Sequence, residues 1–266
     1  MKSIIKINTN GVKKEIGGEK VFVVAEIGKN FIQSREERTV EEYIDNAKKL
    51  IDAAVRAGAD AVKFQTHEVE DEQLNVLITS PHFKEAERFA WVLRNTSSTP
   101  TSFWKEAKEY CVEKNILFFS TPMSKMAAQK LISLDPPLWK IGSGDIEDYV
   151  LLDFLIETRK PIIISTGMIS LADLDKVVKY IKNSGVPLII LYCVSKYPCP
   201  PEDFNLGTIE YFQEKYPGIP VGFSDHSIDG YTVDLAAVKL GAKVIEKHFS
   251  FSRDLWGPDH KASITT

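Results

Sequence analysis

Two histidines each follow a short apolar run of the chain, His226 in GFSDHS and His248 in IEKHFS. Neutral imidazole is a common ligand of divalent transition metals. If the two runs are neighbouring strands, the rings lie close enough to share one ion, with coordination positions left open for water and a substrate oxygen. The pair therefore predicts a catalytic metal site. His67, His82 and His260 lack this placement.

Two lysines and several hydroxyl side chains end the other apolar runs. Lys63 lies in AVKFQT and Lys140 in LWKIGS, and apolar neighbours surround both. A lysine without a partner in such surroundings would carry a desolvation penalty, so an anion is the expected partner. Lysines and short hydroxyl donors together suit a ligand that bears phosphate. The residues expected at the strand ends are Glu26, Lys63, Gln65, Ser120, Thr121, Lys140, Ser143, Ser165, Thr166, Ser195, Tyr197, Ser224, His226 and His248.

Plainer explanations exist for each of these residues taken alone. A lysine at a strand end is most often a solvated surface residue, and a serine or threonine there often caps the following helix. STGM at residues 165–168 and GSGD at residues 142–145 are compatible with simple tight turns. The functional interpretation depends on the recurrence of polar residues at eight strand ends in register.

Eight short apolar runs alternate with amphipathic segments from residue 21 onward. Near-continuous apolar strands that alternate with helices predict a parallel sheet covered on both faces, and eight such units close a (β/α)8 TIM barrel. The alternative is an open doubly wound sheet, but no GxGxxG motif follows the first run. In the helix expected over residues 170–185, Ser170 is a suitable N-cap and Gly185 a suitable stop. The runs are residues 21–28, 59–66, 116–122, 138–144, 161–167, 187–193, 219–225 and 242–249.

Three segments depart from a regular barrel. Residues 1–20 are expected to form a β-hairpin that caps the barrel floor, with residues 21–266 as the catalytic barrel. Residues 68–99 lengthen the interval after the second strand, and an insertion there predicts a lid or a substrate loop on the catalytic face. The chain stops at KASITT before an eighth helix, so the flanks of the first and eighth strands are expected to need a partner, which favours a homodimer.

The composition is that of an ordinary globular protein. Of the 266 residues, 44% are hydrophobic and 26% are charged, and a net charge of −4 gives no electrostatic case for binding nucleic acid or an acidic membrane. No apolar run approaches the length of a membrane span, and the N-terminal segment turns to charged residues and glycine too soon for a signal peptide. The three cysteines form no CxxC pair and fit no disulfide framework. A cytoplasmic location is therefore expected.

A set of sequence blocks extends from the first strand to the end of the chain. The blocks are AEIGKN (25–30), VKFQTHEVED (62–71), FFSTP (118–122), WKIGSGD (139–145), PIIISTGM (161–168), CVSKYPCPPEDFNLG (193–207), GFSDHS (222–227), EKHF (246–249) and GPDHKAS (257–263). Together they resemble the sialic acid synthase family, whose members condense phosphoenolpyruvate with a sugar to form nonulosonic acids. The resemblance does not extend to the C-terminal antifreeze-like domain of that family.

The resemblance implies a metal-assisted condensation of phosphoenolpyruvate with an open-chain N-acetylated hexosamine, N-acetylmannosamine or a related sugar. It implies that His226 and His248 hold a divalent metal, Mn²⁺ or its substitute Mg²⁺, and that Glu26 acts at the reacting carbons. The residues that it assigns to phosphoenolpyruvate are Lys63, Thr121, Lys140, Ser143, Ser165 and Ser224. The residues that it assigns to the sugar are Gln65, Asp145, Tyr197 and Asp259.

Three residues depart from the pattern of this family. Asp145, Ser195 and Phe31 stand where glutamate, asparagine and histidine are common, and all three are expected on the sugar side. Synthases of sialic acid 9-phosphate, legionaminate or pseudaminate are therefore alternatives to N-acetylneuraminate synthase. A pyruvate-dependent metal aldolase is a second alternative, although pyruvate needs no phosphate site. A non-catalytic truncated paralogue is a third.

Overall fold

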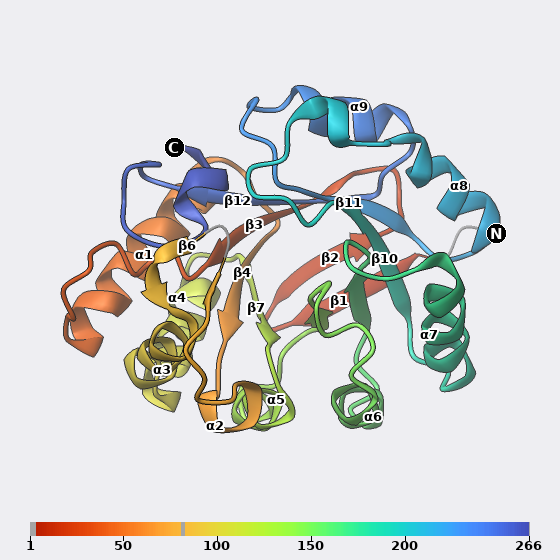
Figure 1. Cartoon of the computed structure of the whole chain (residues 1–266). Helices are drawn as coiled ribbons and strands as arrows, with labels where there is room; N and C mark the ends of the chain where they lie inside the picture. Colours follow the sequence, from red (N-terminus) through yellow and green to blue (C-terminus); the bar gives the residue numbers. More distant parts are fainter. Residues whose placement is uncertain (1–3, 81–82, 266) are drawn as a thin grey trace.

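Eight parallel strands close into a barrel in the computed structural model of this chain, which describes residues 4–80 and 83–265 (Figure 1). Neighbouring strands pair in the order β7-β4-β3-β12-β11-β10-β9-β8, and β7 lies against β8 to close the ring. The predicted (β/α)8 barrel is confirmed, and the alternative of an open doubly wound sheet is wrong. The strands are β3 (Phe22–Gly28), β4 (Ala61–Thr66), β7 (Leu117–Pro122), β8 (Trp139–Ile141), β9 (Ile162–Ser165), β10 (Leu188–Cys193), β11 (Val221–Asp225) and β12 (Val244–Ser250).

Helices follow the barrel strands and pack against their outer faces (Figure 1). The side chain of Ser170 accepts a hydrogen bond from the backbone of Asp173, and Gly185 has a φ of +77°, so the predicted start and stop of that helix are confirmed. No helix of the described residues is long and apolar enough to cross a membrane. The helices are α1 (Val40–Arg56), α4 (Thr101–Glu113), α5 (Lys125–Ile132), α6 (Tyr149–Glu157), α7 (Leu171–Asn183), the 3-10 helix η1 (Pro201–Asp203), α8 (Gly207–Lys215) and α9 (Thr232–Lys239).

The eighth strand ends without a covering α-helix in the described part of the chain. After β12 come the 3-10 helix η2 (His260–Ala262) and the short strand β13 (Ile264–Thr265), which pairs with β12. An apolar groove of about 490 Å³ lies here, bordered by residues of β3, α1 and β12 that include Val23 and Phe249. Val23 is 40% exposed. The flanks of the first and eighth strands are therefore open, as the sequence predicts.

The N-terminal hairpin closes the floor of the barrel with apolar side chains. Strands β1 (Ile5–Thr9) and β2 (Val12–Ile16) pair in antiparallel register, and the hairpin prediction is confirmed. Its buried side chains join those that point into the barrel, so the hairpin and the barrel share one apolar core. This core consists of Ile5, Ile7, Val12, Ile16, Phe22, Val24, Ala61, Leu117, Phe119, Leu138, Ile163, Ile189, Leu191 and Val244.

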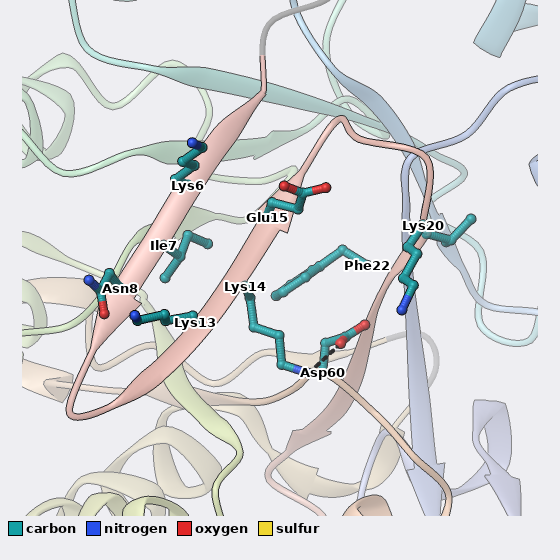
Figure 2. Close-up of a pocket in the computed structure, with 10 residues that line it drawn as sticks. Lys6, Ile7, Asn8, Lys13, Lys14, Glu15, Lys20, Phe22 and Asp60 are labelled. Atoms are coloured by element: carbon teal, nitrogen blue, oxygen red, sulfur yellow. Dashed lines mark hydrogen bonds and ion pairs between the residues drawn. The ribbon is translucent and has the colours of Figure 1, made fainter.

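The polar face of the hairpin borders a groove of about 650 Å³ (Figure 2). Lys6, Lys13, Lys14 and Lys20 line it, and the Nζ atom of Lys14 lies 2.6 Å from the Oδ1 atom of Asp60. The groove lies at the amino ends of β3 and β4, because Phe22 and Asp60 also line it. It holds none of the residues that the sequence predicts for catalysis, which follow the carboxyl ends of the strands.

The insertion after β4 has its own secondary structure. It contains α2 (Val69–Glu72), the strand pair β5 (Thr79–Ser80) and β6 (Phe83–Glu87), and α3 (Arg88–Ser98). Phe83 and Trp91 pack against Trp256, with ring centroids 5.3 and 5.1 Å from its indole ring. The insertion thus packs against the segment that follows β12, on the catalytic side of the barrel. His82 lies outside the described residues.

The tight approach of β11 to its neighbours generates a prediction for Gly222. A Cβ atom at this position would lie 2.6 Å from both the Cβ atom and the backbone oxygen of Val244, and 2.7 Å from Leu191. Because a backbone atom cannot move away cheaply, Gly222→Ala should lower the free energy of unfolding by ~1–3 kcal/mol. Gly144→Ala is the matched control, since a Cβ atom there meets nothing within 4 Å. Urea denaturation of both variants checks this, and equal stability would contradict it.

Candidate active site

The side chains that face into the barrel change from apolar to polar along each strand. Successive residues of a strand point to opposite faces, so Glu26 follows Phe22 and Val24 on the inner side of β3. Lys63 follows Ala61 on β4 by the same alternation. A polar layer therefore lies above the apolar floor, at the carboxyl ends of the strands. Its inward-facing members are Glu26, Lys63, Gln65, Thr121, Lys140, Ser165, Cys193, Ser224, His226, Glu246 and His248.

Lys63 is the centre of a buried network of charges. Its Nζ atom lies 2.8 Å from the Oε2 atom of Glu26 and 3.7 Å from the Oε1 atom of Glu246, and it donates to the hydroxyl of Thr121 at 3.1 Å. The side chains of Lys63 and Glu26 are only 3% and 1% exposed. The amide of Gln65 donates to the other oxygen of Glu26 at 3.0 Å. Four predicted site residues therefore lie together.

Lys140 lies on β8, which β7 separates from β4, and it reaches the same network. Its Nζ atom donates to the hydroxyl of Ser165 at 2.7 Å and to the backbone oxygen of Ile141 at 3.0 Å. It also lies 3.8 Å from the Oε1 atom of Glu246, which accepts a hydrogen bond from Ser224 at 3.1 Å. Glu246 thus lies between the two lysines.

Glu246 was missed as a site residue by the sequence reasoning. The sequence does contain an indication of it, because Glu246 lies two residues before His248 on the same strand, and the two side chains must point to the same face of the sheet. The presence of Glu26 and Glu246 also corrects the argument that Lys63 and Lys140 lack protein partners, since each lysine lies beside a carboxylate. The case for an anion site therefore depends on the surrounding hydroxyl donors as well as on the lysines.

Burial and mutual attraction set the protonation of this network. Burial raises the pKa of Glu26 to about 7, although Lys63 opposes the shift. Burial would lower the pKa of Lys63, but Glu246 and Glu26 hold it above its ordinary value. Burial lowers the pKa of Lys140 despite Glu246. Burial would raise the pKa of Glu246, but Lys140 and Lys63 hold it below its ordinary value. Of the two carboxyl groups in this network, Glu26 rather than Glu246 is therefore the one that is readily protonated near neutral pH.

His226 and His248 face each other, with ring centroids 5.7 Å apart. The Nδ1 atom of His226 lies 2.7 Å from the backbone oxygen of Val194, so it carries the proton and leaves the Nε2 lone pair for a ligand. Burial lowers the pKa of His248 to about 3, and its buried Nδ1 atom has no hydrogen-bond partner in the protein. The ring of Tyr197 stacks on His226 at 3.9 Å between centroids.

These two imidazoles fit a divalent metal with two protein ligands. His248 is held neutral, and an unpartnered buried nitrogen is what a ligand to a metal requires. Burial would lower the pKa of His226, but Cys193 and the Val194 carbonyl raise it above its ordinary value, so a metal must compete there with a proton. No group of three or more histidine, cysteine or acidic side chains within residues 4–80 and 83–265 could hold a metal. The remaining coordination positions would belong to water and substrate.

The residues expected on the sugar side surround this network. A Cβ atom placed on Gly28 would lie within 3.6 Å of Glu26, Gln65 and Asp259, so these three side chains converge. Asp259 is buried and lies 4.0 Å from the Nζ atom of Lys29. Burial raises the pKa of Asp145 to about 7, and the carboxylate of Glu72 adds to the shift. Tyr197 joins this group through its contacts with the histidines.

The hydroxyl of Ser143 accepts a hydrogen bond from the backbone of Gly167 at 3.0 Å, beside Ser195. Ser143 therefore lies between the carboxyl ends of β8 and β9, next to Lys140 and Ser165. Because the Gly167 amide uses only a lone pair of this hydroxyl, its O–H group can still donate to a bound anion.

Several expected strand-end residues point away from the network. Ser120 binds Thr66 at 2.8 Å on the outer side of the strands, and Thr166 donates to the backbone oxygen of Leu191. Phe31, expected on the sugar side, is instead fully buried in the core against Tyr43, Phe64 and Phe103. Strand alternation accounts for Ser120, since Thr121 next to it faces inward.

Three further buried residues, Asp225, His260 and His67, have partners outside the lysine network. Asp225 faces outward, where it accepts from Ser227 and pairs with Lys247. His260 is buried and bonded to Ser250 and to the backbone oxygen of Ile32, which indicates a structural role. The sequence pattern excludes His67 from the metal site. In the structure it directly follows β4 and is buried beside Glu72.

Comparison with known proteins places the chain among synthases of nonulosonic acids. The NeuB family matches residues 50–266. An uncharacterized protein of Methanocaldococcus jannaschii is 36% identical over 97% of this chain and 70% of its own length. The N-acetylneuraminate-9-phosphate synthase of Mus musculus is 33% identical over 94% of this chain and 67% of its own length.

A solved structure agrees with the sequence matches. The N-acetylneuraminic acid synthetase of Leptospira borgpetersenii, solved in complex with citrate, superposes with a TM-score of 0.82 at 31% identity. The match covers 99% of this chain and 85% of that one. A truncated 3-deoxy-D-arabino-heptulosonate 7-phosphate synthase of Thermotoga maritima shares the fold at 13% identity, with a TM-score of 0.70.

The two imidazoles generate a prediction that needs no turnover. Titration calorimetry with Mn²⁺ should give one site per chain, and His226→Ala or His248→Ala should weaken binding by roughly tenfold or more, because each removes one of two protein ligands. The double variant should bind no Mn²⁺. His260→Asn, which alters a buried histidine bonded elsewhere, is the control and should bind as the wild type does. Unchanged Mn²⁺ affinity in the double variant would show that the ion lies elsewhere.

Proposed function

The chain belongs to the NeuB family, and on this premise we propose that it condenses phosphoenolpyruvate with the open-chain form of an N-acetylated hexosamine. The products are a nonulosonic acid and inorganic phosphate. The observation that supports this most is the buried pair of lysines, surrounded by hydroxyl donors and placed beside two imidazoles. We put N-acetylmannosamine first as the acceptor, with the sugars of legionaminate, pseudaminate and sialic acid 9-phosphate synthases as alternatives.

The lysine network is suited to an anion with several charges. With both lysines protonated and Glu26 neutral, Glu246 is the one carboxylate of the described residues that still lies within 4 Å of them, and these four side chains together carry one net positive charge. The hydroxyl donors Thr121, Ser165 and Ser224 already bond within the network and can turn toward phosphate or carboxylate oxygens. A pyruvate-dependent aldolase would have no use for this many donors. We therefore assign Lys63, Thr121, Lys140, Ser143, Ser165 and Ser224 to phosphoenolpyruvate.

The bond changes follow from the two substrates. The methylene carbon of phosphoenolpyruvate attacks the aldehyde carbon, and the aldehyde oxygen takes up a proton to become a hydroxyl group. Water then adds to the former enol carbon, the bond from that carbon to the phosphate oxygen breaks, and phosphate leaves. Lys63 and Lys140 stabilise the phosphate charge as it develops. A divalent cation held by His226 and His248, Mn²⁺ or Mg²⁺, would supply a Lewis acid for the aldehyde oxygen.

Glu26 is the group best suited to move a proton. Its pKa of about 7 lets it exist in both forms near neutral pH, which general acid–base catalysis requires. Its two oxygens face Lys63 and Gln65, so it lies between the anion site and the sugar side. We assign it to the proton transfers that accompany the addition of water.

The sugar side is assigned to Gln65, Asp145, Tyr197 and Asp259. For three of them the support is contact: Gln65 and Asp259 converge on Glu26, and Tyr197 contacts the two histidines. For Asp145 the assignment depends on the sequence pattern and on its pKa of about 7. The chain spans about two thirds of the length of its relatives from Mus musculus and Methanocaldococcus jannaschii. The cytoplasmic location and the homodimer stay predictions. The presence of the assigned residues argues against a non-catalytic paralogue.

Release of phosphate tests the proposal directly. The purified chain, given phosphoenolpyruvate, Mn²⁺ and a panel of N-acetylated hexosamines with and without a 6-phosphate, should release inorganic phosphate with one of them. Mass spectrometry should then find the sum of sugar, phosphoenolpyruvate and water less phosphoric acid. Product formed from pyruvate without phosphate release would support the aldolase instead. Sugar binding without any product would support the non-catalytic paralogue.

The lysine assignment predicts a selective kinetic defect. Lys63→Met or Lys140→Met removes one charge from an enclosed anion site and should cost about 2–4 kcal/mol of transition-state stabilisation. Steady-state kinetics should show a higher KM for phosphoenolpyruvate and a nearly unchanged KM for the sugar. Lys160→Met, which removes only a surface ion pair with Asp135, should leave both values unchanged. Equal losses for both substrates would indicate a structural role for the lysines.

A further inference from the structure

His67 lies at the mouth of the barrel on the side of the proposed sugar residues. It directly follows β4 and comes two residues after Gln65, which faces inward and donates to Glu26. The side chain is only 3% exposed. His67 is therefore a buried imidazole two residues beyond Gln65, nearer to the open end of the barrel.

Glu72 holds the ring of His67 in one orientation. The Nδ1 atom of His67 lies 2.7 and 3.0 Å from the two carboxylate oxygens of Glu72, so Nδ1 donates its proton to them. Burial lowers the pKa of His67 although Glu72 opposes the shift, which keeps the ring neutral. The Nε2 atom is then an acceptor, and it is buried with no hydrogen-bond partner in the protein. An unsatisfied buried acceptor costs free energy, so a role with a ligand is the economical explanation.

The segment that carries Glu72 is tied down on several sides. The backbone of Val69 donates to the hydroxyl of Thr96 at 3.1 Å. The carboxylate of Asp71 accepts from the backbone of Met126 at 2.8 Å, at the start of α5. Glu68 pairs with Lys130. These contacts fix α2 against α3 and α5, so the pair of His67 and Glu72 is preorganised rather than assembled when a ligand binds.

The groups around this pair determine which ligand it suits. The charges that act on the His67 ring after Glu72 are those of Lys29 and Asp259. Glu72 is the charged group that, after burial, most raises the pKa of Asp145. The pair is therefore within electrostatic range of two carboxyl groups, Asp259 and Asp145, and of Lys29. In these surroundings the Nε2 atom of His67, a neutral hydrogen-bond acceptor, suits a ligand that donates from a hydroxyl group.

We propose that His67, oriented by Glu72, accepts a hydrogen bond from one hydroxyl group of the acceptor sugar and thereby takes part in the choice of sugar. The inference rests on the proposed function and deepens it, because it adds a residue for recognition of the sugar. His67 contacts the substrate, and Glu72 is a positioning residue that acts through the ring.

Kinetics with deoxygenated sugars test this contact. Relative to the wild type, His67→Phe should raise the KM for the sugar by about tenfold and leave the KM for phosphoenolpyruvate unchanged. One monodeoxy analogue of the sugar should be about as poor a substrate for the wild type as the parent sugar is for the variant. His67→Phe should not impair that analogue further, because the bond is already lost. His67→Gln, whose amide oxygen can accept the same bond, should recover part of the loss.

Glu68→Gln is the matched control, since it changes a carboxylate of the same short segment that pairs with Lys130 and not with the histidine. It should leave both KM values unchanged. If His67→Phe does not fold, Glu72→Leu replaces it, and the freed ring should give the same selective rise in KM. Equal losses on the parent sugar and on every deoxy analogue, or a loss shared with phosphoenolpyruvate, would overturn the proposal.

Direct binding separates this proposal from the proposed reaction. If the wild type releases no phosphate with any sugar, the reaction is refuted, and calorimetry of the panel sugars then tests His67 alone. Binding that is about tenfold weaker in His67→Phe than in the wild type supports the contact. Equal binding by both proteins, or no sugar binding by the wild type, overturns it.

Discussion

Two lysines can be buried inside a barrel only where carboxylates offset part of their charge. Glu246 does this for both, because its Oε1 atom lies 3.7 Å from Lys63 and 3.8 Å from Lys140. Removing Glu246 would leave Lys140 with no carboxylate within 4 Å among the described residues, and an unpaired buried charge is costly. Glu26 completes the network, and its raised pKa is the consequence of burying a second carboxyl group there. The network therefore provides both positive charge that can bind an anion and a carboxyl group, Glu26, that can exchange a proton.

The apolar floor beneath this network gives it a stable position. The hairpin β1–β2 fills the amino end of the barrel, and its side chains belong to the same core as the inward residues of the strands. Close packing in that core holds the eight strands in register. Because side chains alternate between faces, this register also determines the height at which Lys63, Lys140 and the two histidines stand. The lysine network and the histidine pair therefore depend on the same floor.

The mouth of the barrel is built differently, from segments far apart in the chain. The insertion after β4 and the segment after β12 meet through Phe83, Trp91 and Trp256. The same two segments supply His67 with Glu72 on one side and Asp259 on the other. Under the proposed function, variation in these segments would change the contacts to the acceptor sugar, while the residues proposed for phosphoenolpyruvate, which lie on the barrel strands and their ends, would keep their positions.

The sequence by itself determined the elements and most of the inward-facing polar residues. Apolar runs, caps such as Ser170 and the alternation along a strand are local, so they can be read without knowing where the chain goes next. Tertiary structure decided which of these residues share partners. Glu246 joins two lysines from other strands, Phe31 turns into the core, and Asp259 approaches Glu26 across more than two hundred residues of sequence. The pairing of His67 with Glu72 likewise depends on how α2 is held by α3 and α5. Such contacts depend on the packing of separate segments, and no local pattern specifies that.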